Sequence, residues 1–154
     1  MKVVVALIML VGLLFGEDGV KKVVIDLTTA DVAVYEKKIL SGIVAHKTHY
    51  ENSLEELEVA VVIHGGAYRF FLKSLRSTVY EGDAALQKRL DEMQKRTTTL
   101  ADTYGVEFLL CDVGRKNNKL SLENLLPFVK VVPNSTIGLI DKQNEGYAYI
   151  PVAK

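Results

Sequence analysis

The side chain best suited to covalent chemistry is Cys111, the only cysteine among the 154 residues. It ends the segment Val-Glu-Phe-Leu-Leu-Cys at residues 106–111, whose mostly apolar composition predicts a buried strand that ends at the thiol. A thiol at a strand end is partly exposed, and backbone N–H groups or a helix N-terminus there stabilise the nucleophilic thiolate. Free cysteine is also among the most buried residue types, so inert packing is the alternative. The carboxylate of the neighbouring Asp112 would raise the pKa of a thiol beside it.

A second polar group follows the apolar run at residues 59–63, where His64, Gly65 and Gly66 come in succession. A His-Gly-Gly turn after a strand is typical of the oxyanion loop of lipases and esterases, but the sequence lacks the G-x-S-x-G elbow of those enzymes. Glycines at such a turn let the backbone approach a ligand closely. We expect these residues to line a ligand site, and the alternative is a histidine bonded to a loop carbonyl.

Both groups belong to the carboxyl ends of strands, where open parallel sheets bind their ligands. One possible order has the strand of residues 23–27 between those of residues 59–63 and 106–111. His64 and Cys111 would then be two strand spacings apart, about 10 Å. A bound ligand can bridge that separation, whereas a direct hydrogen bond cannot.

The remaining histidines give little support for a metal site. His46 and His49 stand one turn apart near Glu51, but no C-x-x-C or H-E-x-x-H spacing accompanies them. They also fall near the end of an expected helix, where histidine is common. The sequence contains neither a P-loop nor a G-x-G-x-x-G turn, so it offers no nucleotide site. We therefore expect no metal and no cofactor.

Short apolar runs alternate with segments of helical periodicity along most of the chain. This alternation predicts a single α/β domain, built on an open, mostly parallel five-stranded sheet with helices on both faces. Residues 78–83 are rich in turn formers and are expected to form a mobile loop. The expected strands are 23–27, 59–63, 106–111, 129–132 and 147–150, and the expected helices are one that begins at residue 31 and includes His46 and His49, and those at 67–75, 86–104, 121–126 and 134–144.

Charge and cysteine content exclude several classes of function. Nineteen basic residues balance nineteen acidic ones, so net charge does not favour nucleic acid or an anionic membrane surface. A single cysteine allows no internal disulfide. The fold must therefore depend on burial of its apolar side chains.

The first residues have the pattern of an export signal. Lys2 precedes an apolar stretch over residues 3–16, which is long enough for a signal peptide and short for a membrane span. We expect residues 1–16 to be a signal peptide, residues 20–154 to be the domain, and the location to be periplasmic. An uncleaved leader that anchors the protein in the inner membrane and an extra buried strand are the alternatives.

Three segments resemble the DsrE/DsrF-like family of sulfur-relay proteins, in particular its exported subgroup. They are Tyr-Gly-Val-Glu-Phe-Leu-Leu-Cys at 104–111, Leu-Leu-Pro-Phe-Val-Lys-Val-Val-Pro at 125–133 and Gln-Asn-Glu-Gly-Tyr-Ala-Tyr-Ile at 143–150. The resemblance extends from about Val23 to the C-terminus. It implies a parallel α/β sandwich that assembles into homo-oligomers, either trimers or hexamers.

The resemblance also implies a function, because Cys111 matches the cysteine that carries persulfide sulfur in active members. The protein would be at most a sulfurtransferase-like carrier and, with no second cysteine, would exchange sulfur with a donor or acceptor protein. Relatives usually continue with a segment such as Gly-Asn-Thr-Leu, whereas this chain has basic residues that could hold an anionic sulfur species. The alternative is a small-ligand-binding oligomeric module in which Cys111 is structural. The expected ligand-binding residues are His64, Gly65, Gly66, Arg115 and Lys116.

Overall fold

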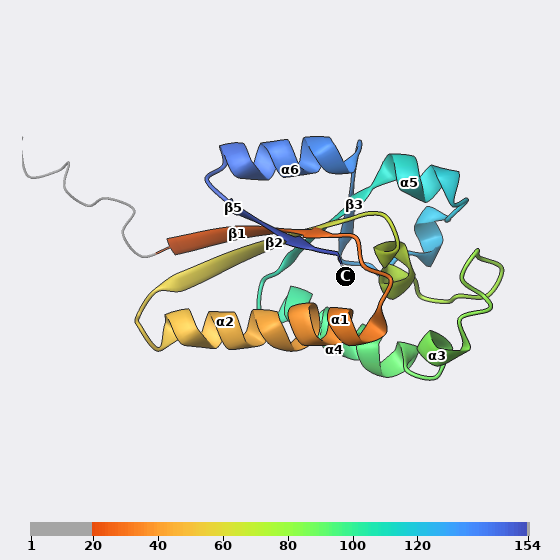
Figure 1. Ribbon diagram of the computed structural model, residues 1–154, viewed down its shortest axis with the longest axis horizontal. Coiled ribbons are helices and arrows are strands. Elements are labelled where there is room, and N and C mark those ends of the chain that lie inside the picture. The colour runs from red at the N-terminus through yellow and green to blue at the C-terminus, as the bar shows by residue number, and fades with distance from the viewer. Residues whose placement is uncertain (1–19, 154) are drawn as a thin grey trace, which may run out of the picture.

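The computed structural model describes residues 20–153, and the expected leader lies outside that range. The described residues form one sheet of five parallel strands (Figure 1). The strand order is β4-β3-β2-β1-β5, so β2 is the middle strand and β4 and β5 are the edges. The strands are β1 Val20–Leu27, β2 Glu56–Ile63, β3 Glu107–Cys111, β4 Val129–Val132 and β5 Ala148–Val152.

Helices cover both faces of the sheet, with α1, α2 and α4 on one side and α6 on the other (Figure 1). The expected class, a five-stranded parallel α/β sheet with helices on both faces, is confirmed. Within residues 20–153 no helix has both the length and the apolar character needed to cross a bilayer. The helices are α1 Val32–Tyr35, the π-helix η1 Glu36–Ser41, α2 Gly42–Glu51, the 3₁₀-helix η2 Ala67–Phe71, α3 Ala84–Gln87, α4 Leu90–Asp102, α5 Asp112–Asn117, the 3₁₀-helix η3 Leu122–Asn124 and α6 Ser135–Asn144.

The larger core, on the side of α1, α2 and α4, is built around aromatic rings. Tyr35 stacks on Phe70 with ring centroids 4.2 Å apart. Phe71 packs edge-on against Tyr35 at 5.9 Å and is tilted against Phe108 at 5.3 Å. All four rings are at most 1% exposed. These contacts fix η2, which carries Phe70 and Phe71, against α1 and the sheet.

The smaller core lies beneath α6. Successive side chains of a strand point to opposite faces, so alternate residues of β1, β2 and β3 meet on this side. Gly138 lets α6 approach the sheet, since a Cβ there would lie only 3.3 Å from a methyl group of Val132. The buried members of this core are Val24, Ala60, Val62 and Leu109.

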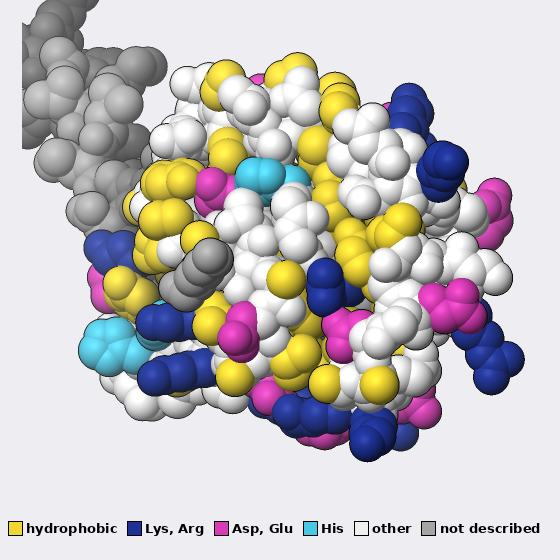
Figure 2. All heavy atoms as spheres, turned by 45° about the vertical axis from the view of Figure 1, so that its right-hand side comes forward, with side chains coloured by type: hydrophobic (Ala, Val, Ile, Leu, Met, Phe, Trp, Pro, Cys, Tyr) yellow, Lys and Arg dark blue, Asp and Glu magenta, His cyan; other side chains and the backbone are white. Residues whose placement is uncertain are grey.

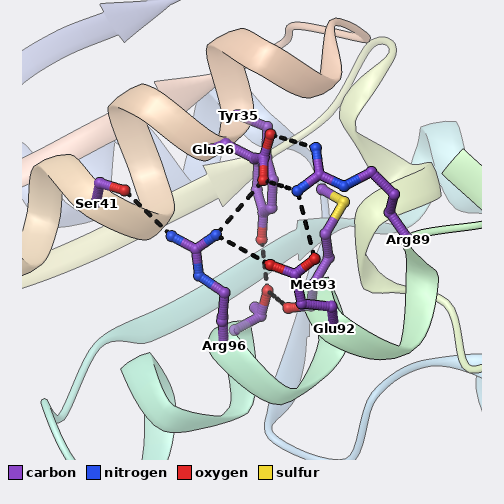
Figure 3. Close-up of polar contacts among 8 residues, drawn as sticks. Tyr35, Glu36, Ser41, Arg89, Glu92, Met93 and Arg96 are labelled. Atoms are coloured by element: carbon purple, nitrogen blue, oxygen red, sulfur yellow. Dashed lines mark hydrogen bonds and ion pairs between the residues drawn. The ribbon is translucent and has the colours of Figure 1, made fainter. Parts of the chain in front are cut away.

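A polar cluster joins the first helical segment to α4 (Figure 3). The Glu36 carboxylate accepts a bidentate pair of hydrogen bonds from Arg89, and its Oε1 lies 3.4 Å from Nη1 of Arg96. Alongside, the buried Tyr35 hydroxyl lies 2.8 Å from Oγ1 of Thr97. Glu36 opens η1, so the cluster connects the π-helical segment to a part of the chain more than 50 residues away.

The observed strand order corrects one sequence-based expectation. β1 pairs with β2 and β5, and β2, rather than β1, lies beside β3. The last pair between β2 and β3 joins Ile63 to Leu110, so His64 and Cys111 follow it on neighbouring strands. The expected gap of two strand spacings is therefore wrong. Their backbones are one spacing apart, about 5 Å.

Besides the helix expected over residues 121–126, which is only the 3₁₀-helix η3 Leu122–Asn124, two expected helices differ from the observed ones. The helix expected over residues 67–75 is only the 3₁₀ segment η2, because Leu72 turns extended and forms an antiparallel bridge with Leu125. The helix expected over residues 86–104 is divided into α3 and α4 at Arg89, whose side chain binds Glu36. Long-range contacts thus override the local periodicity in both segments.

Three smaller differences follow from tertiary packing. Tyr80, in the segment expected to form a mobile loop, is only 9% exposed and lies beside Arg69 in a cation–π contact of 4.8 Å. β5 continues through Pro151, which is compatible with a strand at the edge of the sheet. The segment after Cys111 forms the helix α5, which the sequence analysis did not predict.

Candidate functional site

Cys111 is the last residue of β3 and the N-cap residue of α5. The thiol is therefore held between a central part of the sheet and the first turn of a helix. The residue is 5% exposed, more deeply buried than expected for a strand end. This sulfur can therefore be reached only by a slender reagent, or by a larger partner after a small conformational opening.

The pKa of the Cys111 thiol is lowered from its usual range. Burial raises this pKa, but the donor groups around the thiol, which are the backbone N–H of Gly114, the Tyr68 hydroxyl, and the N–H and hydroxyl of Ser135, lower it by more. Gly114 belongs to α5 and Ser135 is the first residue of α6. Two helices thus direct N-terminal donors at one sulfur, which is an environment that stabilises a thiolate.

Replacing Ser135 by alanine should slow alkylation of Cys111 by iodoacetamide about tenfold at neutral pH. The change removes a hydroxyl that lowers the thiol pKa, so less thiolate is present, and a hydrogen bond to a charged group contributes about 1.5 kcal/mol. The pH at which the rate is half-maximal should move upward, and the alkaline plateau should not change. Thr136→Ala, at the next and exposed position of α6, is the control. Equal pH profiles for the two variants would contradict the assignment.

Tyr68 forms the floor of the site. Its hydroxyl donates to the carbonyl oxygen of Cys111 at 3.0 Å, and the ring is 1% exposed. Burial, followed by the hydrogen bond to Cys111, raises the pKa of Tyr68, so the hydroxyl keeps its proton as a donor. A Cβ at Gly114 would lie 1.9 Å from this hydroxyl oxygen. The turn after Cys111 therefore needs glycine at position 114.

His64 is part of a hydrogen-bonded chain that the sequence analysis missed. Its Nε2 lies 2.6 Å from Oδ1 of Asp26, at the carboxyl end of β1. The Tyr149 hydroxyl of β5 donates to the other oxygen of Asp26 at 2.7 Å. The expected alternative, a histidine satisfied by a loop carbonyl, is replaced by a carboxylate partner. Asp26 lies within an apolar run and Tyr149 is 123 residues away, so no local pattern links them.

Gly65 and Gly66 shape the turn that follows β2. Gly65 has a φ of +61°, in the left-handed region that favours glycine. A Cβ at Gly66 would lie 2.6 Å from the Cβ of Ala30, and the Gly66 N–H donates to the carbonyl of Thr28 at 3.0 Å. Close packing against the loop after β1 accounts for both glycines. The turn thereby fixes the position of His64.

Arg115 and Lys116 are both paired with Asp112 inside α5. Arg115 Nε lies 2.7 Å from Oδ1 of Asp112, and its Nη1 donates to the carbonyl of Leu120 at 2.6 Å. Lys116 Nζ lies 2.7 Å from the other Asp112 oxygen. These hydrogen bonds lower the pKa of Asp112, first that from Lys116 and then that from Arg115. The carboxylate beside Cys111 thus has its charge balanced within α5.

His46 and His49 are exposed on α2. In the part of the chain that the structure describes, no three side chains of the kinds that bind metal come together.

The surface around the carboxyl edge is partly apolar. Figure 2 shows this side of the molecule, with hydrophobic side chains exposed next to a histidine and an acidic side chain, and with basic side chains gathered mostly at the periphery. Exposed hydrophobic residues on the elements nearest the site include Val113 of α5, Ile137 of α6 and Tyr149 of β5. Such a surface suits contact with another protein.

Fold and site define an open α/β protein with a single thiol at the carboxyl edge of a parallel sheet. The model of the DsrE/DsrF-like family matches residues 22–152, and the chain belongs to this family. The family is generally linked to sulfur relay.

Two further proteins are similar to this chain. An uncharacterized protein of Aquifex aeolicus (strain VF5) is 32% identical over 94 residues, which is 56% of this chain and 41% of the relative. The chain thus matches less than half the length of that relative. The structure of MTH1491, a protein of unknown function from Methanobacterium thermoautotrophicum, superposes with a TM-score of 0.59. That match covers 85% of this chain and 98% of MTH1491 at 20% identity, and it supports the fold.

Proposed function

We propose that this protein handles sulfane sulfur, which it accepts and passes on as a persulfide of Cys111. The observation that carries the proposal is the thiol with a lowered pKa at the junction of β3, α5 and α6. A thiolate is the form of cysteine that attacks sulfur, and buried donors also stabilise the anionic outer sulfur of a persulfide. Membership of the DsrE/DsrF-like family supports the same chemistry.

The transfer conserves atoms and electrons. The Cys111 thiolate attacks the sulfane sulfur of a donor persulfide R–S–SH, one S–S bond forms and another breaks, and the donor leaves as a thiol. The overall change is Cys–SH plus R–S–SH to Cys–S–SH plus R–SH, so no external oxidant is needed. The same exchange in reverse direction passes the sulfur to an acceptor thiol.

The sulfur must leave to another molecule, because the sequence contains no second cysteine. A donor or acceptor protein with a cysteine on a slender segment fits best, since Cys111 is only 5% exposed. The exposed side chains of Val113 and Ile137 offer such a partner an apolar contact surface beside the thiol.

Intact-mass measurement tests the proposal. Incubation with polysulfide should add one sulfur atom to the wild-type protein, and dithiothreitol should remove it. Cys111→Ser should gain none. No addition to the wild type, or an equal addition to Cys111→Ser, would contradict the proposed function.

The burial of Cys111 favours a second candidate, a small-ligand-binding module with a structural thiol. A thiol-reactive probe distinguishes the two, because a structural buried thiol reacts slowly at neutral pH and a stabilised thiolate reacts fast. Fast labelling of folded protein supports the carrier, and labelling only after denaturation supports the binding module.

We further propose that the protein acts as a trimer or hexamer in the periplasm. The resemblance to the exported subgroup supports the assembly, and the apolar stretch over residues 3–16 supports export. An uncleaved leader would instead anchor the protein in the inner membrane.

A further inference from the structure

A row of polar side chains crosses the carboxyl edge of the sheet. Tyr149 of β5 donates to Asp26 of β1, and Asp26 binds His64, which directly follows β2. The next strand in the sheet order is β3, and it ends at Cys111. The three hydrogen-bonded side chains thus lie on β5, β1 and the end of β2, and the thiol lies on the next strand, β3.

These residues share one face of the sheet. Val24 and Val62 belong to the core under α6, so Asp26 and His64, two residues further along each strand, also point to that side. Leu109 lies in the same core and Cys111 comes two residues later in β3, with Ser135 of α6 among the donor groups that lower its thiol pKa, and its buried side chain also packs in the larger core. His64 and Cys111 are therefore neighbours across one strand spacing and on one face.

Asp26 is an unusual residue to find in this strand. It interrupts the run Val-Val-Ile-Asp-Leu, and its side chain is only 15% exposed. Burying a carboxylate costs free energy unless hydrogen bonds compensate, and here both oxygens are engaged, by His64 and Tyr149. A buried carboxylate that orients a histidine next to a thiol is a typical arrangement of catalytic sites.

The hydrogen bond to Asp26 decides which nitrogen of His64 can act. A carboxylate only accepts, so Nε2 keeps its proton and Nδ1 is left as the basic nitrogen. Among residues 20–153, Nδ1 makes no hydrogen bond. The ring is 28% exposed, so a molecule bound at the edge of the sheet can reach it.

We propose that His64 transfers the proton in sulfur exchange at Cys111, and that Asp26 and Tyr149 are the positioning residues that hold its ring. This inference rests on the proposed function and names the acid–base group of the same site. His64 Nδ1 accepts the proton of a Cys111 side chain that is still a thiol, and the resulting thiolate attacks the donor persulfide. The same nitrogen then gives that proton to the departing thiolate R–S⁻, so His64 ends the exchange neutral as it began.

The charged and titratable groups that face His64 come from few elements. Asp26 bonds to it from β1 and Tyr149 supports Asp26 from β5, while Cys111 and Asp112 lie at the junction of β3 and α5, one strand spacing from His64. The first turn of α6 carries no acidic side chain. The Asp112 carboxylate is paired with Arg115 and Lys116 of α5. The carboxylate bonded to the His64 ring is that of Asp26.

The test is the rate of sulfur transfer to Cys111, followed by intact mass as a function of pH. His64→Ala should slow transfer at neutral pH about a hundredfold, the usual contribution of a positioned acid–base group. The defect should shrink at alkaline pH, where the thiol ionises without a base, and added imidazole should restore part of the neutral rate. Asp26→Asn should show a smaller defect of the same pH dependence, and Tyr149→Phe the smallest.

Matched controls are available at the other end of the sheet. Tyr147 donates to Glu58 at 2.9 Å, which repeats the tyrosine–carboxylate pair away from the thiol. Glu58→Gln and Tyr147→Phe should therefore transfer sulfur at the wild-type rate. His49→Ala, on the exposed side of α2, controls for the loss of a histidine.

Two results would overturn the inference: a wild-type rate for His64→Ala at neutral pH, or a defect that persists at alkaline pH and does not respond to imidazole. If the wild type accepts no sulfur, the proposed function fails separately. The same variants are then compared by iodoacetamide alkylation of Cys111, which also requires loss of the thiol proton. A neutral-pH defect of His64→Ala in alkylation would support the acid–base role, and equal rates would overturn it.

Discussion

Replacing Gly114 by alanine is expected to lower the free energy of unfolding by about 2–4 kcal/mol. The new methyl group would lie 1.9 Å from the Tyr68 hydroxyl oxygen and 2.7 Å from the ring carbon that bears it. Tyr68 is 1% exposed and cannot swing away, so either α5 moves or the ring leaves its place. Overpacking of a core costs about 1–3 kcal/mol, and loss of the Tyr68–Cys111 hydrogen bond adds about 1 kcal/mol.

Urea unfolding measures this effect, and the chain provides its own control. At Gly82 an added Cβ meets no atom within 4 Å, so Gly82→Ala should leave stability within about 0.5 kcal/mol of wild type. Adding Tyr68→Phe to Gly114→Ala removes the shorter contact and should recover part of the loss. If Gly114→Ala proves as stable as Gly82→Ala, the turn after Cys111 tolerates a side chain and the close contact does not define it.

The sheet could be predicted from the sequence because its strands are buried on both faces. Runs such as residues 59–63 contain little besides Val, Ile and Ala, and such runs are typical of central parallel strands. Cys111 and His64 were placed at strand ends for the same reason, since each ends such a run. Local pattern thus predicts that both candidate side chains lie at strand ends on one edge of the sheet.

The strand order and the partners of His64 could not be read from local pattern. Helical crossovers are compatible with several orders, and the observed one places β2, not β1, next to β3. Asp26 has the position of a buried strand residue, and only the pairing of β1 with β5 brings Tyr149 to it. These contacts join residues far apart in the sequence, so they depend on the complete fold.

Arg115 and Lys116 show that the sequence alone does not reveal which partners charged side chains bind. Their charges were expected to attract an anionic sulfur species, but α5 places both within reach of Asp112, three and four residues earlier. The helix was not anticipated because Gly114 and a polar composition resemble a loop. The N–H groups of Gly114 and Ser135, which lower the pKa of the thiol, are donors that sequence composition does not reveal.

Phe71→Ala is the second change with a large expected effect, a loss of about 3–5 kcal/mol in the free energy of unfolding. Phe71 is fully buried and touches the rings of both Tyr35 and Phe108. Its carbonyl also accepts the N–H of Leu126, which ties η2 to the segment that leads into β4. The substitution leaves a cavity where α1, η2 and β3 meet.

Phe71→Ala should also affect the site around Cys111, because η2 carries both Phe71 and Tyr68. Urea unfolding gives the stability, and labelling of Cys111 by a thiol probe under native conditions gives its accessibility. Val79→Ala, at a position that is 63% exposed, should change stability by about 0.5 kcal/mol or less. In Phe71→Ala the loss of stability should come with faster labelling, since transient opening of η2 exposes a thiol that is otherwise 5% exposed. A loss below about 1 kcal/mol would show that neighbouring rings fill the space, and unchanged labelling would show that η2 does not control access to Cys111.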